Sequence, residues 1–152
     1  MEIFRISNQK YFPHDPAISA LSSEGRWHQK GEKVLYFSSS LALCVLELKA
    51  NGVSFKSIRE RFHFSSSTIT EKQTIEIVPT KFYKAEWQSS KKGSQEFGSH
   101  WFTQNQSLIL KVKSAVLGHE MNFIINPMHK QFLSLKFSSP KAVPLDARLT
   151  EE

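Results

Sequence analysis

The chain has 152 residues, of which 39% are hydrophobic and 12% aromatic, and it carries a formal net charge of +6. This length and composition predict one globular domain spanning residues 1–152 and exclude an intrinsically disordered chain. The single cysteine, Cys44, excludes an internal disulfide and indicates a packed thiol in a reducing compartment. The sequence has no signal-peptide pattern and no apolar run near the ~18 residues of a membrane span, so we expect a cytoplasmic protein.

The positive charge is compatible with nucleic acid, an acidic ligand or an acidic partner protein. Lysine and arginine are spread along the whole chain, with no run longer than Lys91–Lys92. An ordinary solvated surface would have the same scattered charges. Because no basic cluster or nucleic-acid-binding motif is present, we do not expect direct nucleic-acid binding.

The first half of the chain predicts a strand at Ile3–Ile6, a loop at Phe12–Pro16 and a strand at Lys33–Phe37. Serines 38–40 then offer an N-cap for a helix over Leu41–Lys49. Four apolar positions of this helix share one face and predict its buried stripe: Leu41, Cys44, Val45 and Leu48.

The second half predicts one more helix, Ser94–Gln104, among several short apolar runs. These runs are expected to be strands: Thr74–Val78, Leu108–Val112, Ser114–Leu117, Met121–Ile125, Phe132–Phe137 and Ala142–Leu145. Many strands and few helices predict an α+β fold with a mainly antiparallel sheet.

Several residues could carry chemistry, although each also has a structural explanation. Arg26 stands between Gly25 and Gly31, where its planar guanidinium could bind a phosphate or simply lie on a surface turn. Tyr36 could be a packed aromatic, and Glu47, beside the apolar stripe of its helix, could be solvated or could line a cleft.

The remaining motifs are weaker and exclude some classes of site. Ser114 has no nucleophile elbow around it, and His129 follows Asn126-Pro127 in a turn where it could be structural or an acid–base group. The six histidines have no metal-ligand spacing, so we expect no metal site. Neither a Walker loop nor a Rossmann fingerprint is present.

Taken in order, these residues resemble the RES family, which is named for an arginine, a glutamate and a serine. The resemblance covers nearly the whole chain and is carried by short segments in the family's order: Phe4-Arg5-Ile6, Gly25-Arg26-Trp27-His28, Gly31, Val34-Leu35-Tyr36, Ser38–Ser40 with Ala42 and Glu47, Gly98–Trp101, Lys113-Ser114-Ala115-Val116, Asn122, Asn126–His129 and Leu145–Leu149. Two positions depart from the family pattern: His28 replaces an asparagine, and Lys113 replaces a proline.

The resemblance implies an ADP-ribosyltransferase-like fold, in which a split β-sheet with a few helices surrounds an NAD cleft. It implies a toxin of a type II toxin–antitoxin system, paired with an Xre-type antitoxin that carries a helix-turn-helix domain and makes any DNA contact. The implied reaction is degradation of NAD, the substrate, at the nicotinamide–ribose bond, as an NAD glycohydrolase or NAD phosphorylase. A protein ADP-ribosyltransferase is the first alternative. The alternative from another class, which the charge of +6 and the histidines would support, is a basic nucleic-acid-binding or ribonuclease toxin.

The resemblance also implies roles for individual residues. Glu47 would stabilise the positive charge on the ribose, Arg26 would bind the pyrophosphate, and Tyr36 would stack on nicotinamide. Ser114 would hydrogen-bond the carboxamide or a ribose hydroxyl. Arg5 and Asn126 are further candidates for NAD binding or for shaping its site.

Overall fold

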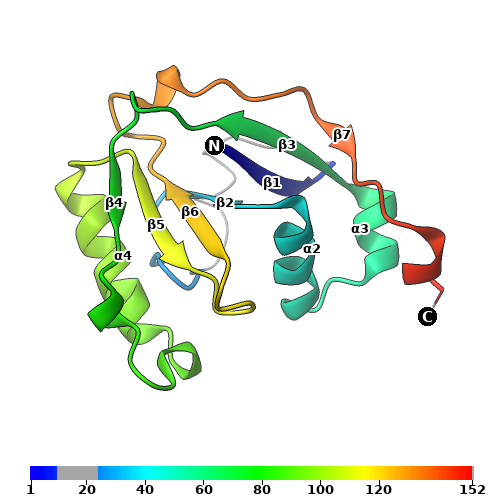
Figure 1. The fold of residues 1–152 in the computed structure, drawn as a ribbon, viewed down its shortest axis with the longest axis horizontal. Helices are drawn as coiled ribbons and strands as arrows, with labels where there is room; N and C mark the ends of the chain where they lie inside the picture. The colour runs from blue at the N-terminus through cyan, green and yellow to red at the C-terminus, as the bar shows by residue number, and fades with distance from the viewer. Residues whose placement is uncertain (10–23, 152) are drawn as a thin grey trace.

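One sheet of seven strands organises the residues that the computed structural model describes, which are 1–9 and 24–151. The strand order is β4-β5-β6-β2-β1-β3-β7 (Figure 1). Its strands are β1 Glu2–Asn8, β2 Leu35–Ser38, β3 Phe62–Thr68, β4 Ile75–Ile77, β5 Ile109–Lys113, β6 Met121–Ile125 and β7 Lys141–Ala142, and the helices are α2 Leu41–Ala50, α3 Phe55–Arg61 and α4 Lys92–Gln104. The pair β4–β5 is parallel and the other described pairs are antiparallel, which confirms the expected α+β class.

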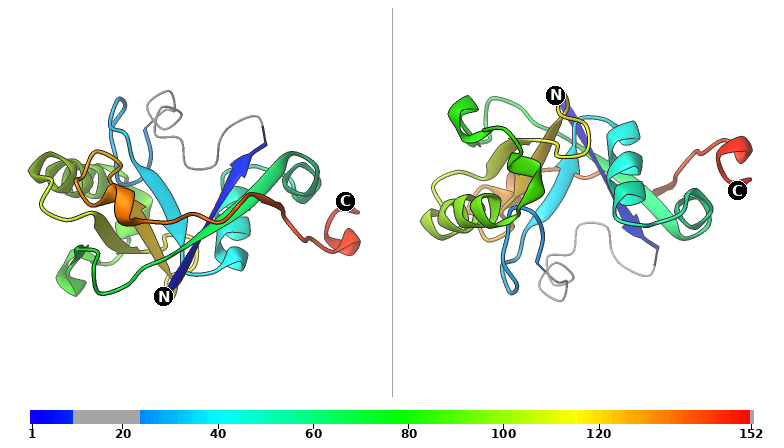
Figure 2. Two further views of the ribbon diagram at one scale, coloured as in Figure 1. Left: turned by 90° about the horizontal axis from the view of Figure 1, so that it is seen from above. Right: turned by 90° about the horizontal axis from the view of Figure 1, so that it is seen from below.

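The sheet is split between β2 and β1. Within the described residues these strands pair at one position, Phe4 opposite Ser38. Their outer neighbours are much better joined, since β1 pairs with β3 along its whole length and β2 pairs with β6 from Leu35 to Ser38. The sheet therefore divides into two halves that diverge from one point of contact (Figures 1 and 2).

Alternation along the strands creates a core on each face of the larger half. Leu35 and Phe37 of β2 point into a core that Leu135 and its neighbours cover from the C-terminal segment. The opposite face holds Leu110 of β5 and Trp101 of α4. A third apolar cluster lies between α2, α3 and the C-terminal segment, and contains Val45, Ile58 and Val143.

The helix α2 begins where the serines predict. The Ser40 hydroxyl accepts a hydrogen bond from the Leu43 backbone N–H and caps the helix. The buried stripe is displaced from the predicted one, because Leu43, Cys44 and Val45 are its most buried residues while Leu41 is half-buried. The free thiol of Cys44 is buried, as the sequence indicates.

Three predicted strands are wrong or too long. Residues 114–117 form a turn, because the Ser114 hydroxyl accepts hydrogen bonds from the backbone N–H groups of Val116 and Leu117. Phe132–Ser134 is a 3₁₀ turn, and of the predicted strand Ala142–Leu145 only the first residue lies in β7. From Leu135 onward the chain runs as an extended segment to β7 (Figures 1 and 2).

Other elements were not predicted or cannot be compared. No local sequence pattern predicts the segment that forms α3 and β3. The predicted loop Phe12–Pro16 lies outside the described residues. The predicted strands Thr74–Val78, Leu108–Val112 and Met121–Ile125 are confirmed as β4, β5 and β6, and the predicted helix Ser94–Gln104 as α4, with small shifts at their ends.

Gly98 lets α4 lie against the loop that carries Arg26. A Cβ atom at this position would lie 1.7 Å from the carbonyl oxygen of Trp27, which is backbone and cannot rotate away. We therefore predict that Gly98→Ala lowers the free energy of unfolding by about 3 kcal/mol or more, or prevents folding. Urea denaturation followed by circular dichroism measures this loss.

Gly93 of the same helix provides the matched control. A Cβ there would have its nearest neighbour at 3.9 Å, the ring of Phe82. Gly93→Ala should therefore leave stability within about 1 kcal/mol of wild type, on the stabilising side. Equal effects of the two substitutions would show that contact with Trp27 does not constrain the helix.

Candidate active site

A cleft of about 750 Å³ lies at the split in the sheet. Its walls come from both halves of the sheet and from α2, so it depends on the divergence of β1 and β2. Four of the six candidate residues line it: Arg5, Arg26, Tyr36 and Glu47. Ser114 and Asn126 are not among the lining residues.

The carboxylate of Glu47 is fixed by two hydrogen bonds to one oxygen. The Ser114 hydroxyl donates to Oε1 over 2.8 Å, and the Asn122 side-chain amide donates to the same atom over 2.7 Å. Ser38 completes the network by donating its hydroxyl proton to Asn122 Oδ1 over 2.8 Å. Within the described residues Oε2 accepts no hydrogen bond. The arrangement therefore holds a carboxylate in one orientation with one oxygen left for a ligand.

Ser114 acts on Glu47 from a fully buried position. Its hydroxyl donates to Glu47 and accepts from two backbone N–H groups of the following turn. These bonds use the hydroxyl proton and both lone pairs. The geometry favours a role in orienting Glu47 over direct contact with a ligand.

Arg26 enters the cleft from the loop before β2. Its Nη2 donates to the backbone oxygen of Gln88 over 2.9 Å, and its guanidinium carbon lies 5.6 Å from the centre of the Trp87 ring. Within the described residues Nη1 is buried without a hydrogen-bond partner. A buried guanidinium nitrogen without an acceptor is costly, so an anion bound here would satisfy it.

Tyr36 faces the cleft and holds the Arg26 loop through its hydroxyl. The backbone N–H of Trp27 donates to the hydroxyl over 3.1 Å, and Nδ1 of His28 lies 2.7 Å from it. A Cβ at Gly25 would lie only 2.5 Å from the His28 ring and 2.8 Å from the hydroxyl, which explains the glycine there. Burial raises the pKa of Tyr36 well above its usual value, so the phenol stays neutral. His28, one of the two departures from the family pattern, thus packs against the cleft wall.

Arg5 lies in the gap where β1 and β2 diverge. It donates a hydrogen bond from Nη1 to the Tyr36 carbonyl oxygen over 3.2 Å. Burial lowers the pKa of Arg5 to about 10, which leaves it positively charged at neutral pH. Arg5 therefore joins the two halves of the sheet and adds positive charge to the cleft wall.

Asn126 and His129 lie in the turn after β6. Asn126 donates from its side-chain amide to Asn105 Oδ1 over 2.9 Å and accepts from the Met128 N–H. The Nδ1 atom of His129 accepts from the Gln131 N–H, and the histidine is 5% exposed. These contacts give both residues a structural part, and a role of Asn126 in NAD binding stays a prediction that its position does not favour.

Sequence reasoning missed the part that Asn122 plays. Its contact with Glu47 depends on the register of β6 against β2, which places Asn122 opposite Ser38. The sequence predicts the two strands separately and does not show how they pair, so it does not place Ser38 opposite Asn122. The resemblance did single out Asn122, but without a role.

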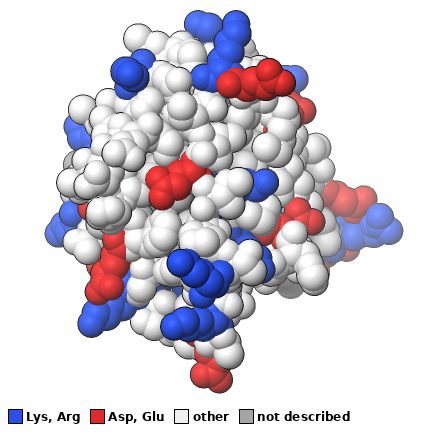
Figure 3. Space-filling view, turned by 60° about the vertical axis from the view of Figure 1, so that its left-hand side comes forward, with Lys and Arg blue, Asp and Glu red and all other residues white. Residues whose placement is uncertain are grey.

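Three observations bear on other classes of site. On the face drawn in Figure 3, lysine and arginine alternate with acidic residues and form no continuous basic patch. Among residues 1–9 and 24–151, no three His, Cys, Asp or Glu side chains gather as metal ligands. In the same residues, no helix is long and apolar enough to cross a membrane.

The split sheet and its cleft define the class as an ADP-ribosyltransferase-like α+β fold. A solved structure with the same fold is a chain of the M. tuberculosis MbcT–MbcA toxin–antitoxin complex, with a TM-score of 0.71 at 12% identity over 93% of this chain and 83% of that chain. The RES domain model matches residues 2–146, and the chain belongs to this family.

Curated relatives in the family carry toxin names. "Toxin Res" of Photorhabdus laumondii is 32% identical over 87% of this chain and 85% of its own length. "Toxin Res" of Yersinia enterocolitica is 28% identical over 98% of this chain and 99% of its own length. The "Prs ADP-ribosylating toxin" of a Sphingobium species is 25% identical over 82% of this chain and 80% of its own length. The chain is therefore a RES-domain toxin.

The reactivity of Cys44 tests the structure of the cleft without an assay of enzymatic activity. It lines the cleft, donates a hydrogen bond to the Phe4 carbonyl oxygen over 3.2 Å, and has its pKa raised to about 11 by burial. Because the thiolate is the nucleophile, iodoacetamide should alkylate the folded protein slowly at pH 8 and faster only as the pH approaches 11. Intact-mass spectrometry follows the reaction, with urea-unfolded protein as the fast-reacting control. Rapid alkylation of folded protein at pH 8 would contradict this environment.

Proposed function

We propose that this toxin consumes NAD in the cytoplasm by cleaving the bond between nicotinamide and ribose. One observation carries the proposal. A carboxylate oriented by Ser114 and Asn122 shares a cleft with the buried, unsatisfied Nη1 of Arg26. NAD has an anionic pyrophosphate, and positive charge develops on its ribose as nicotinamide leaves; Arg26 suits the first and Glu47 the second.

The chemistry assigns each residue a part. Nicotinamide leaves as a neutral base, and positive charge develops on the ribose in an oxocarbenium-like transition state. Glu47 is preorganised to stabilise this charge, because its hydrogen bonds hold it without reorganisation. Arg26 would bind the pyrophosphate, and the Tyr36 ring would offer nicotinamide a flat apolar surface. The reaction needs no metal in this account.

The acceptor of the ADP-ribosyl group is water in the primary proposal, which makes the enzyme an NAD glycohydrolase. Phosphate would make it an NAD phosphorylase, with the same bond cleaved. The name of the Sphingobium relative supports a protein side chain as a further acceptor, and hence protein ADP-ribosylation. All three share the cleft and the part played by Glu47.

We also propose that an antitoxin of the Xre type, with a helix-turn-helix domain, binds and inhibits the toxin. The likeness of the fold to a chain of a toxin–antitoxin complex supports an antitoxin partner. Inhibition by occlusion would require the antitoxin to cover Arg26 and the mouth of the cleft.

Replacement of Glu47 by glutamine should remove the activity without unfolding the protein. The amide keeps the shape of the carboxylate but loses the negative charge, which should lower turnover about 100- to 1000-fold. The measurement is the NAD concentration in cells shortly after induction of wild type or Glu47→Gln. A fall of NAD with both proteins would contradict the role of Glu47. Stable NAD in cells arrested by wild type would overturn NAD degradation and direct attention to labelled transfer onto a protein target.

Replacement of Arg26 by alanine should mainly weaken substrate binding. Loss of a charge-assisted bond to phosphate predicts a KM for NAD raised about 10- to 100-fold, with a smaller change in kcat. Steady-state release of nicotinamide by the purified protein measures both constants. An unchanged KM would assign Arg26 to the support of its loop alone.

A further inference from the structure

Lys113 is a further cation of the cleft, besides Arg5, Arg26 and Lys91, and the proposed function has not used it. It ends β5 directly before Ser114, and it lines the cleft. Its ammonium nitrogen lies 5.0 Å from the centre of the Tyr83 ring. Within the described residues it forms no ion pair with a carboxylate, so its charge is available to a ligand.

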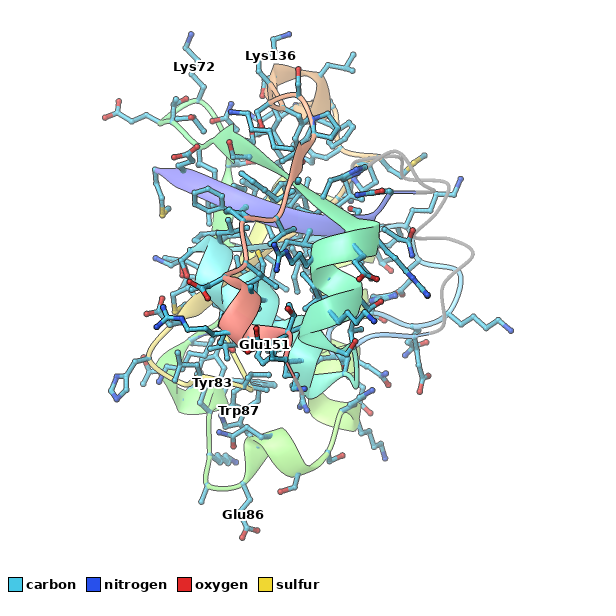
Figure 4. All side chains as sticks on the ribbon, turned by 90° about the vertical axis from the view of Figure 1, so that its right-hand side faces the viewer. Lys72, Tyr83, Glu86, Trp87, Lys136 and Glu151 are labelled. Atoms are coloured by element: carbon cyan, nitrogen blue, oxygen red, sulfur yellow. The ribbon has the colours of Figure 1, made fainter. Side chains whose placement is uncertain are left out.

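Arg26 and Lys113 lie on two neighbouring aromatic rings. The Arg26 guanidinium lies over Trp87 at 5.6 Å, and the rings of Trp87 and Tyr83 meet edge to face at 4.9 Å between centroids. Both rings belong to the segment before α4, where Figure 4 shows Tyr83 and Trp87 close together. A cation–π contact restrains each cation but leaves its charge in place, whereas a carboxylate would neutralise that charge.

Hydrogen bonds join the Arg26 guanidinium and the backbone of Lys113 to this same segment. The backbone N–H of Lys113 donates to the Tyr83 hydroxyl over 2.9 Å, and Nη2 of Arg26 donates to the Gln88 carbonyl oxygen over 2.9 Å. Glu86, which lies between the two rings in sequence, points away from the protein in Figure 4 and is exposed. The segment therefore supports both Arg26 and Lys113, and its own carboxylate, Glu86, stays out of the cleft.

We infer that Arg26 and Lys113 form a two-point clamp for the pyrophosphate of a dinucleotide, with the Tyr83–Trp87 ring pair as its support. The inference rests on the proposed function and names the second anion-binding residue of that site. Two cations match the two negative charges of a pyrophosphate, and partial burial strengthens each contact. Proline, which the resemblance implies at position 113, would have neither the ammonium group nor the N–H that donates to Tyr83. The clamp is thus a property of this chain's own sequence.

Calorimetric titration of the purified protein with ADP-ribose, ADP, inorganic pyrophosphate and adenosine tests the clamp without turnover. Lys113→Gln keeps the backbone bond to Tyr83 and removes only the charge. It should weaken binding of the three phosphate-containing ligands about 10- to 100-fold and leave adenosine unchanged. Lys113→Arg should retain most of the affinity.

Lys111→Gln is the matched control, since Lys111 lies on the same strand, over the Phe123 ring at 5.9 Å, and does not line the cleft. It should bind all four ligands as wild type does. Tyr83→Leu removes the ring and the hydroxyl together and should weaken pyrophosphate binding through the position of Lys113, while Tyr83→Phe should have a smaller effect.

The outcomes separate the clamp from the proposed function. Wild-type affinity in Lys113→Gln would overturn the clamp while the proposed function stands, and so would equal losses in Lys113→Gln and Lys111→Gln. Failure of the wild-type protein to bind ADP-ribose or ADP would overturn both. A loss confined to phosphate-containing ligands in Lys113→Gln would establish the clamp.

Discussion

The pairing of β1 with β2 at one position, Phe4 opposite Ser38, is the constraint on which the site depends. Because the strands part beyond this pair, the sheet opens a cleft instead of burying both strands in a continuous ladder. The helix α2 follows β2 directly and is tied to β1 by the hydrogen bond from Cys44 to the Phe4 carbonyl oxygen. Glu47 is thereby carried on a rigid element into the gap, which a preorganised catalytic group requires.

The structure explains several of the short segments that carry the resemblance to the family. Gly98 allows α4 to touch the backbone of Trp27, and Gly25 leaves space for the pair of His28 and Tyr36. The serine of the family name orients the glutamate, since its hydroxyl donates to Glu47. The family's motif residues therefore include residues that position other side chains as well as residues that would contact a substrate.

The helices and strands with strong apolar patterns could be predicted from the sequence. The resemblance singled out Arg26, Tyr36 and Glu47, which line one cleft in the structure. Sequence reasoning assigned nothing to β3, where three consecutive serines obscure the strand pattern. It extended a strand through residues 114–117, where the Ser114 hydroxyl instead binds the backbone of a turn. Asn122 and the support of Lys113 by Tyr83 depend on register and on a distant segment, which no local pattern contains.

The central claim is that the cleft at the split binds NAD with its reacting ribose at Glu47. A crystal structure of Glu47→Gln with bound NAD tests it most directly, because the substitution should slow cleavage enough to trap the substrate. We expect the nicotinamide ribose within hydrogen-bonding distance of residue 47 and the pyrophosphate beside Arg26. A dinucleotide bound elsewhere, or in this cleft with its nicotinamide ribose away from residue 47, would contradict it.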